Sequence, residues 1–125
     1  MINRLGQVMV YVNNLKKAKE FWTEKLDFIV LEEDLEIQGL RRIEVAPKKA
    51  MTSIVLTDKA FVAEMEPEMN LGTPSLMFFT DDLEQLYSDM TEKEITLGDL
   101  VTMPSGEKVF NFADNEDNYF AVMEK

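Results

Sequence analysis

The order of apolar and polar residues restarts once along the chain, and this internal repeat restricts the possible folds more than any other feature. Gln7 and Ser75, which each open an alternating apolar segment, lie 68 positions apart. Four further pairs keep this offset to within one residue: Leu15 with Leu83, Ala18 with Leu86, Trp22 with Met90, and Val55 with Val122. Because half of a 125-residue chain is too small to close a hydrophobic core alone, the two copies must pack together.

The residue pattern of each copy predicts one strand, then one amphipathic helix, then further strands. The first copy opens with the alternating strand Gln7–Val12 and an Asn13-Asn14 helix cap, whose side-chain oxygens can accept from the free amides of the first turn. Apolar residues at helical spacing then predict a helix over residues 14–26. Three more strands follow between turn residues, at Phe28–Glu33, Leu40–Val45 and Thr52–Thr57.

The second copy follows the same order. It opens with the strand Ser75–Thr80, an Asp81-Asp82 cap and a helical stripe that ends at Met90. A short strand or turn at Ile95 comes next, and two strands close the copy, at Val109–Ala113 and Tyr119–Met123.

The acidic segment between the copies, residues 59–72, is predicted to be a linker because it contains Pro67 and the acidic residues Glu64, Glu66 and Glu68. The first module then covers about residues 1–58 and the second about residues 73–125 of a single domain. The predicted fold class is α+β, with two βαβββ modules.

The composition excludes several classes of chemistry. The chain has no cysteine and no histidine, so it lacks thiolate nucleophiles, disulfides and the commonest general base and metal ligand. Its net charge of −11 disfavours nucleic acid and anionic membranes and favours a cationic ligand, although acidic surfaces also serve solubility. Neither a signal peptide nor a bilayer-length apolar run is visible, so we expect a cytoplasmic protein without a membrane partner.

Six segments carry a resemblance to a known family: Gln7–Leu15, Ala18–Trp22, Leu26–Phe28, Phe78–Leu83, Pro104–Gly106 and Phe112–Tyr119. Their order and spacing resemble the vicinal oxygen chelate superfamily, which includes glyoxalase I, bleomycin resistance proteins and extradiol dioxygenases. The resemblance spans nearly the whole chain. It implies that the two modules form a curved mixed sheet around a cupped cavity, with helices on the outer face, usually in a homodimer.

The resemblance also implies where a metal would sit in the metal-dependent members, which point one ligand from each of four strands into the cavity. Carried over by position, these sites are Gln7, Val55, Ser75 and Val122. A divalent metal needs three or four nitrogen or oxygen donors, and neither valine offers one. We therefore expect no metal and no other cofactor, and Gln7 either contacts a ligand or is a satisfied polar group at a strand start.

Aromatic and methionine side chains are numerous enough to line an adaptable pocket as well as a core. Four of them share alternation parity with the implied metal positions and are predicted to face a ligand: Tyr11, Met77, Phe79 and Phe120.

Glu44 is a further candidate, on the same face as Arg42 if the third strand alternates strictly. It has two interpretations: a carboxylate that enters an apolar cavity and acts as a base, or a member of a charge pair at a solvated strand edge. The acidic run from Asp114 to Asn118 lacks the glycine and closing glutamate of a calcium loop, so a tight turn is predicted there.

The sequence thus supports three functions of different classes. The first is a metal-independent protein that binds a small cationic or aromatic organic molecule and sequesters it by binding alone. The second is a lyase, isomerase or dioxygenase that holds a metal through Gln7, Glu44 or another carboxylate, and whether the chain is an enzyme stays open. The third is a ligand-free interaction module with a methionine-rich surface.

Overall fold

The computed structural model describes residues 1–33 and 41–125 of the chain. These residues form two compact units, Met1–Pro74 and Ser75–Lys125, each with its own four-stranded mixed sheet. The predicted α+β fold class is confirmed. Leu40, the predicted first residue of the third strand, lies outside the described residues. Within the described part of the chain, no helix is both long enough and apolar enough to cross a bilayer.

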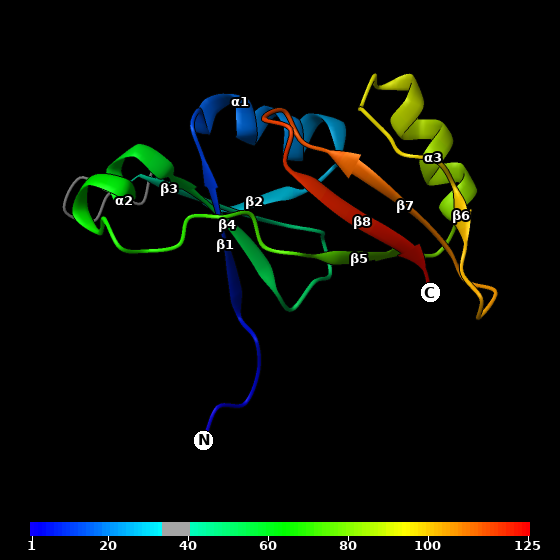
Figure 1. The fold of residues 1–125 in the computed structure, drawn as a ribbon, viewed down its shortest axis with the longest axis horizontal. Helices are drawn as coiled ribbons and strands as arrows, with labels where there is room; N and C mark the ends of the chain where they lie inside the picture. The colour runs from blue at the N-terminus through cyan, green and yellow to red at the C-terminus, as the bar shows by residue number, and fades with distance from the viewer. Residues whose placement is uncertain (34–40) are drawn as a thin grey trace. The chain divides into compact units, whose positions relative to one another are not determined.

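The sheet of the first unit has the strand order β1-β4-β3-β2 (Figure 1). Its strands are β1 (Gln7–Val12), β2 (Ile29–Glu33), β3 (Arg42–Ala46) and β4 (Ser53–Asp58). β1 runs parallel to β4, whereas β4 with β3 and β3 with β2 are antiparallel pairs. Parallel neighbours need a crossover, and the helical segment after β1 begins that crossover.

The predicted helix after β1 is present in two parts, α1 (Leu15–Glu20) and the π-helical turn η1 (Phe21–Lys25). Asn14 caps α1, because its side-chain oxygen accepts from the backbone N–H of Lys17 at 3.0 Å. Ala18 and Trp22 are fully buried on the side that packs against the first sheet. The helix therefore covers one face of this sheet and leaves its other face for other contacts (Figure 1).

The first half of the predicted linker, residues 59–72, forms a helix that was not predicted from the sequence, α2 (Lys59–Met65). Asp58 caps this helix by accepting from the backbone N–H of Ala60 at 3.1 Å. Val62 is buried and gives the helix an apolar contact. The helix breaker Pro67 lies beyond the last helical residue, so it ends the helix and does not prevent it.

The second unit repeats the topology with the strand order β5-β8-β7-β6 and a parallel β5–β8 pair (Figure 1). Its elements are β5 (Met77–Thr80), α3 (Leu83–Glu92), β6 (Val101–Thr102), β7 (Lys108–Ala113) and β8 (Tyr119–Glu124). Asp82 caps α3 through the backbone N–H of Gln85 at 3.1 Å, as the sequence predicts. The predicted turn after Ala113 is also present, since Asp114 accepts from two backbone amides there.

Candidate functional site

Side chains from three strands share the face of the first sheet that lies opposite α1. Paired residues of a sheet point to the same side, so the strand register identifies the members of this face. They form three rows across β1, β4 and β3: Gln7 with Ser53; Met9 with Val55 and Glu44; and Tyr11 with Thr57 and Arg42. We call these eight residues the Glu44 face.

The Glu44 carboxylate is held by two donors from neighbouring strands. Its Oε2 atom accepts a hydrogen bond from the Ser53 hydroxyl at 2.5 Å and another from the Gln7 side-chain amide at 3.1 Å. Ser53 is 5% exposed, so its hydroxyl has little access to water. Hydrogen bonds to an ionised carboxylate are stronger than neutral ones, and together they fix Glu44 toward the Gln7 row.

Arg42 lies in the row on the opposite side of Glu44 from those two donors. Its Nε atom is buried and has no hydrogen-bond partner among residues 1–33 and 41–125, and no described carboxylate forms an ion pair with its guanidinium. The strand β3 lies between β2 and β4, so it is not a sheet edge. The interpretation of Arg42 and Glu44 as a charge pair at a solvated strand edge is therefore wrong.

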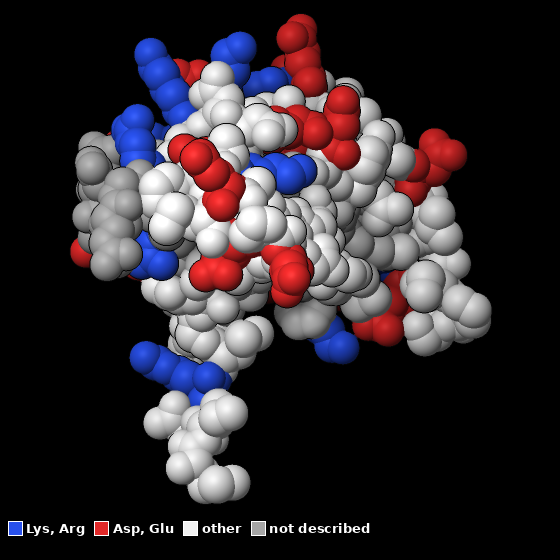
Figure 2. All heavy atoms as spheres, turned by 60° about the vertical axis from the view of Figure 1, so that its left-hand side comes forward, with Lys and Arg blue, Asp and Glu red and all other residues white. Residues whose placement is uncertain are grey.

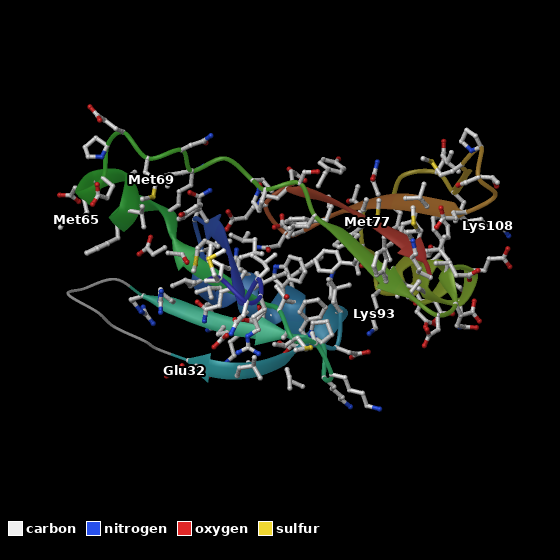
Figure 3. All side chains as sticks on the ribbon, turned by 90° about the horizontal axis from the view of Figure 1, so that it is seen from below. Glu32, Met65, Met69, Met77, Lys93 and Lys108 are labelled. Carbon is white, nitrogen blue, oxygen red and sulfur yellow. The ribbon has the colours of Figure 1, made fainter. Side chains whose placement is uncertain are left out.

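Tyr11 completes the row that contains Arg42. Its hydroxyl contacts the sulfur of Met69 at 3.6 Å, and thioether sulfur is a weak acceptor. Figure 3 shows Met69 on the segment that follows α2. Between Tyr11 and Arg42 stands Thr57, which is buried and donates its hydroxyl to the Val55 carbonyl at 3.1 Å. The row thus places two long side chains with donor groups on either side of one short residue.

The structure brings together four of the predicted site residues on this face: Gln7, Tyr11, Glu44 and Val55. Ser53, Thr57 and Arg42 were not predicted to contact a ligand. Alternation from Val55 along the fourth strand would have found Ser53 and Thr57, because residues two apart in a strand point to the same side.

The predicted site residues of the second unit divide between two faces of its sheet. Met77 pairs with Ala121 and shares its side with Phe79 two residues after it, whereas Ser75 precedes β5. Met77 and Phe79 are 47% and 63% exposed. Figure 3 shows Met77 on β5. Whether these three side chains contact a ligand stays a prediction.

The expectation that Phe120 and Val122 share the face of Met77 is wrong. Val122 pairs with Phe78 and with Phe110, whose ring packs against Tyr87 of α3 at a centroid distance of 5.0 Å. Phe120 lies on that same side and is buried among aromatic rings, 6.1 Å from the ring of Phe78. Both residues therefore belong to the core beneath α3. A shift of one residue in the register moves every side chain of a strand to the other face.

The residues of the Glu44 face do not fit a catalytic metal. The described ranges, 1–33 and 41–125, contain no group of three or more histidine, cysteine, aspartate or glutamate side chains that could hold an ion. On the face itself Val55 offers only hydrocarbon, and the amide nitrogen of Gln7 is turned to Glu44. The one carboxylate is already bound by two protein donors, so the donor set lacks the charge that a divalent metal needs.

A separate hollow of about 570 Å³ lies beside the start of α1 in the first unit. Its lining is mostly charged or amide-bearing: Asn13, Asn14, Leu15, Lys16, Lys19, Glu33, Arg41, Ile43 and Asp58. Lys19 and Glu33 form an ion pair at 2.5 Å. None of the predicted site residues lines this hollow, and its charged lining with a paired Lys19 suits water better than an apolar ligand.

The charges of the molecular surface are mixed where Figure 2 displays them. Basic side chains gather at the upper left of that view, and acidic side chains lie in its middle and on its right. The net charge of −11 therefore arises from a surface that carries both signs. Local groups such as Arg42 and Glu44 decide which charge a bound molecule meets at short range, since salt screens more distant charges beyond about 8 Å.

Comparisons with known proteins agree on one family. The family model described as Glyoxalase/Bleomycin resistance protein/Dioxygenase superfamily matches residues 4–122. A Bacillus subtilis (strain 168) protein, "Uncharacterized protein YetH", is 34% identical over 125 residues, which cover 99% of this chain and 100% of that protein.

Two solved structures are similar over nearly their whole length. TnmS3, described as an antibiotic binding protein from Streptomyces sp. CB03234, is 27% identical with a TM-score of 0.83, and the match covers 98% of this chain and 96% of that one. A superfamily member from Sphaerobacter thermophilus DSM 20745 is 22% identical with a TM-score of 0.85 and covers 99% and 98% of the two chains. The second likeness shows the fold alone.

Proposed function

Because the chain belongs to the Glyoxalase/Bleomycin resistance protein/Dioxygenase superfamily, we propose that it binds a small aromatic organic molecule on the Glu44 face without a metal ion. The observation that carries this proposal is that Glu44 is hydrogen-bonded within the protein. Its carboxylate accepts from Ser53 and Gln7 and so serves the protein as a fixed polar group. A face with fixed polar groups and apolar residues between them suits recognition of an organic molecule.

Two further observations support binding over catalysis. The Glu44 face combines an aromatic ring at Tyr11, the flexible apolar chain of Met9 and the hydrocarbon of Val55, which together suit a planar ligand. TnmS3, 27% identical to this chain, is described as an antibiotic binding protein. Binding alone would then give the protein its function, by sequestering the compound.

The proposal includes a homodimer. A row of four side chains crosses the second sheet on the side away from α3: Phe79, Met123, Val109 and Val101. Phe79 and Val101, at the two ends of this row, are 63% and 51% exposed, so the row carries apolar side chains that reach solvent. A second copy would bury them. Light scattering should give twice the mass of 14.4 kDa, and Phe79→Ser should shift the mass toward the monomer; a monomeric wild type contradicts this part.

The experiment that tests the binding proposal uses a matched set of naphthalene probes and protein treated with EDTA. The set comprises 2-naphthamide, 2-naphthoate and 2-naphthylmethylammonium, which share one ring system and differ in charge. Calorimetry should detect binding of at least one probe to metal-free protein, with an affinity that added Zn²⁺, Ni²⁺ or Mn²⁺ does not change. A lack of binding to the whole set, or binding only after a metal is restored, would overturn the proposal.

A further inference from the structure

We propose that Arg42 anchors an anionic group of the ligand, so that the molecules bound on the Glu44 face are aromatic organic acids. This inference rests on the proposed function and names its substrate class. It starts from an arginine that is part-buried in a sheet yet has its Nε atom buried without a hydrogen-bond partner in the described ranges. A buried donor that lacks an acceptor costs stability, and because Arg42 is only part-buried its guanidinium carries further donors for a ligand oxygen.

The first step of the argument is the position of the nearest carboxylate on the same strand. Glu44 lies two residues from Arg42 on β3, so both side chains point to the same face. The Glu44 carboxylate accepts instead from Ser53 and Gln7, in the row on its far side from Arg42. The two hydrogen bonds hold the negative charge away from the guanidinium, which therefore keeps its capacity to bind a different anion.

The second step is the composition of the row that contains Arg42. At its other end the Tyr11 hydroxyl contacts, in the described part of the chain, the weak acceptor Met69 sulfur at 3.6 Å, so it can turn to a better acceptor. Thr57, between the two, donates its hydroxyl inward to the Val55 carbonyl. A guanidinium presents several donors and no acceptor, and the phenol adds one donor. The row therefore offers donors to a ligand, and a carboxylate can accept from two of them.

The third step weighs this local charge against the net charge of −11, which favours cations at long range. Salt at physiological strength screens exposed charges beyond about 8 Å, whereas a direct contact with a part-buried guanidinium is screened much less. The local contact decides the affinity, and the acidic surface only slows the approach of an anion. Added salt should consequently raise the association rate of an organic acid with this protein.

The test compares the three naphthalene probes on wild-type protein and on Arg42→Met, which keeps a similar length without the charge. Wild type should bind 2-naphthoate at least tenfold more tightly than 2-naphthamide, and Arg42→Met should remove that preference, because a hydrogen bond to a charged group contributes about 1.5–3 kcal/mol, or roughly 10- to 150-fold in affinity. Binding of 2-naphthamide should change little. Arg42→Lys should restore part of the preference, since an ammonium keeps the charge but not the bidentate geometry.

Circular dichroism and thermal unfolding of each variant establish that it is folded. Because the chain has only three arginines, the Nε–H resonance of Arg42 can be assigned by its absence from Arg42→Met, and it should shift when 2-naphthoate is added. If all probes bind equally, or 2-naphthylmethylammonium binds best and Arg42→Met changes nothing, the inference fails while the proposed function stands. If no probe binds to wild type, both fail.

Discussion

The Ser53 hydroxyl donates to the Glu44 carboxylate at 2.5 Å, across the neighbouring strands β4 and β3. This hydrogen bond joins a buried neutral donor to a part-buried carboxylate. The side-chain amide of Gln7, on β1, donates to the same carboxylate oxygen. Three strands are thus tied through one carboxylate oxygen. The same contact sets the direction of Glu44 and leaves the guanidinium of Arg42 on the other side of the row.

Replacement of Ser53 by alanine tests the contribution of this contact to stability. Glu44 would lose its buried donor, and Ser53→Ala should lower the free energy of unfolding by about 1–3 kcal/mol. Urea titration followed by fluorescence of Trp22, the single tryptophan, measures the change. Ser105→Ala is the matched control, because Ser105 is exposed and its hydroxyl donates to the part-buried Glu107 side chain; it should change stability by less than about 0.5 kcal/mol. Equal effects of the two substitutions would contradict the account.

Removal of the Tyr11 hydroxyl separates binding from stability. Within residues 1–33 and 41–125 this hydroxyl bonds to the weak acceptor of Met69, so Tyr11→Phe should leave the free energy of unfolding almost unchanged. The affinity for 2-naphthoate should fall by about three- to tenfold, which corresponds to the loss of one ordinary hydrogen bond. Tyr119→Phe, at a 57% exposed position of the second unit, should change neither quantity. A loss of stability in Tyr11→Phe without a loss of affinity would refute this role.

Replacement of Trp22 tests how much the packing of the helix on the sheet of the first unit contributes to stability. Its side chain is fully buried, and its ring contacts those of Phe21 and Phe28 at centroid distances of 5.7 and 5.1 Å. Trp22→Ala should lower the free energy of unfolding by about 3–5 kcal/mol, because it leaves a large cavity. Trp22→Phe should cost less, and circular dichroism in urea compares the two. Similar costs would show that cavity size does not decide the effect.

Lys108 gives a prediction on pH. The hydrogen bond and the negative charge of the Glu84 carboxylate raise the pKa of Lys108 above its ordinary value of 10.5. A raised pKa in the folded protein means that the stabilisation is complete below the unfolded pKa and is lost as the pH rises through the folded pKa. Glu84→Gln should bring the pKa of Lys108 back toward its ordinary value in an NMR titration. An unchanged titration in this variant would show that the ion pair does not form in solution. Figure 3 shows Lys108 on β7.

The sequence predicts the strands well because period-two alternation and short polar caps are local properties. Asn14 and Asp82 cap their helices as predicted, and the 68-residue offset identifies the repeated topology. The register of the last strand, β8, cannot be predicted from such local patterns, because it depends on contacts between residues that are distant in the sequence. Met9 pairs with Val55 and Met77 with Ala121, so the equivalent of Val55 is Ala121 and not Val122. One residue of slip placed Phe120 and Val122 on the wrong face.

The candidate site shows the same division between local and distant information. The alternation of β3 places Arg42 and Glu44 on one face, as the sequence predicts. Which of the two is hydrogen-bonded within the protein depends on Ser53 and Gln7, which reach Glu44 from other strands. No local sequence pattern predicts such hydrogen bonds between strands. Helix α2 differs from the prediction for a simpler reason, because Pro67 ends a helix without preventing one in the residues before it.

The most direct measurement of the central claim is a methyl NMR spectrum of EDTA-treated protein labelled at its methionines, recorded with and without 2-naphthoate. Met9 lies on the Glu44 face and Met69 contacts Tyr11, so their methyl signals should shift together. Met51 and Met103, which are exposed elsewhere in their units, should not shift. Shifts confined to methionines other than Met9 and Met69, or no shifts until a metal is added, would contradict metal-free binding on this face.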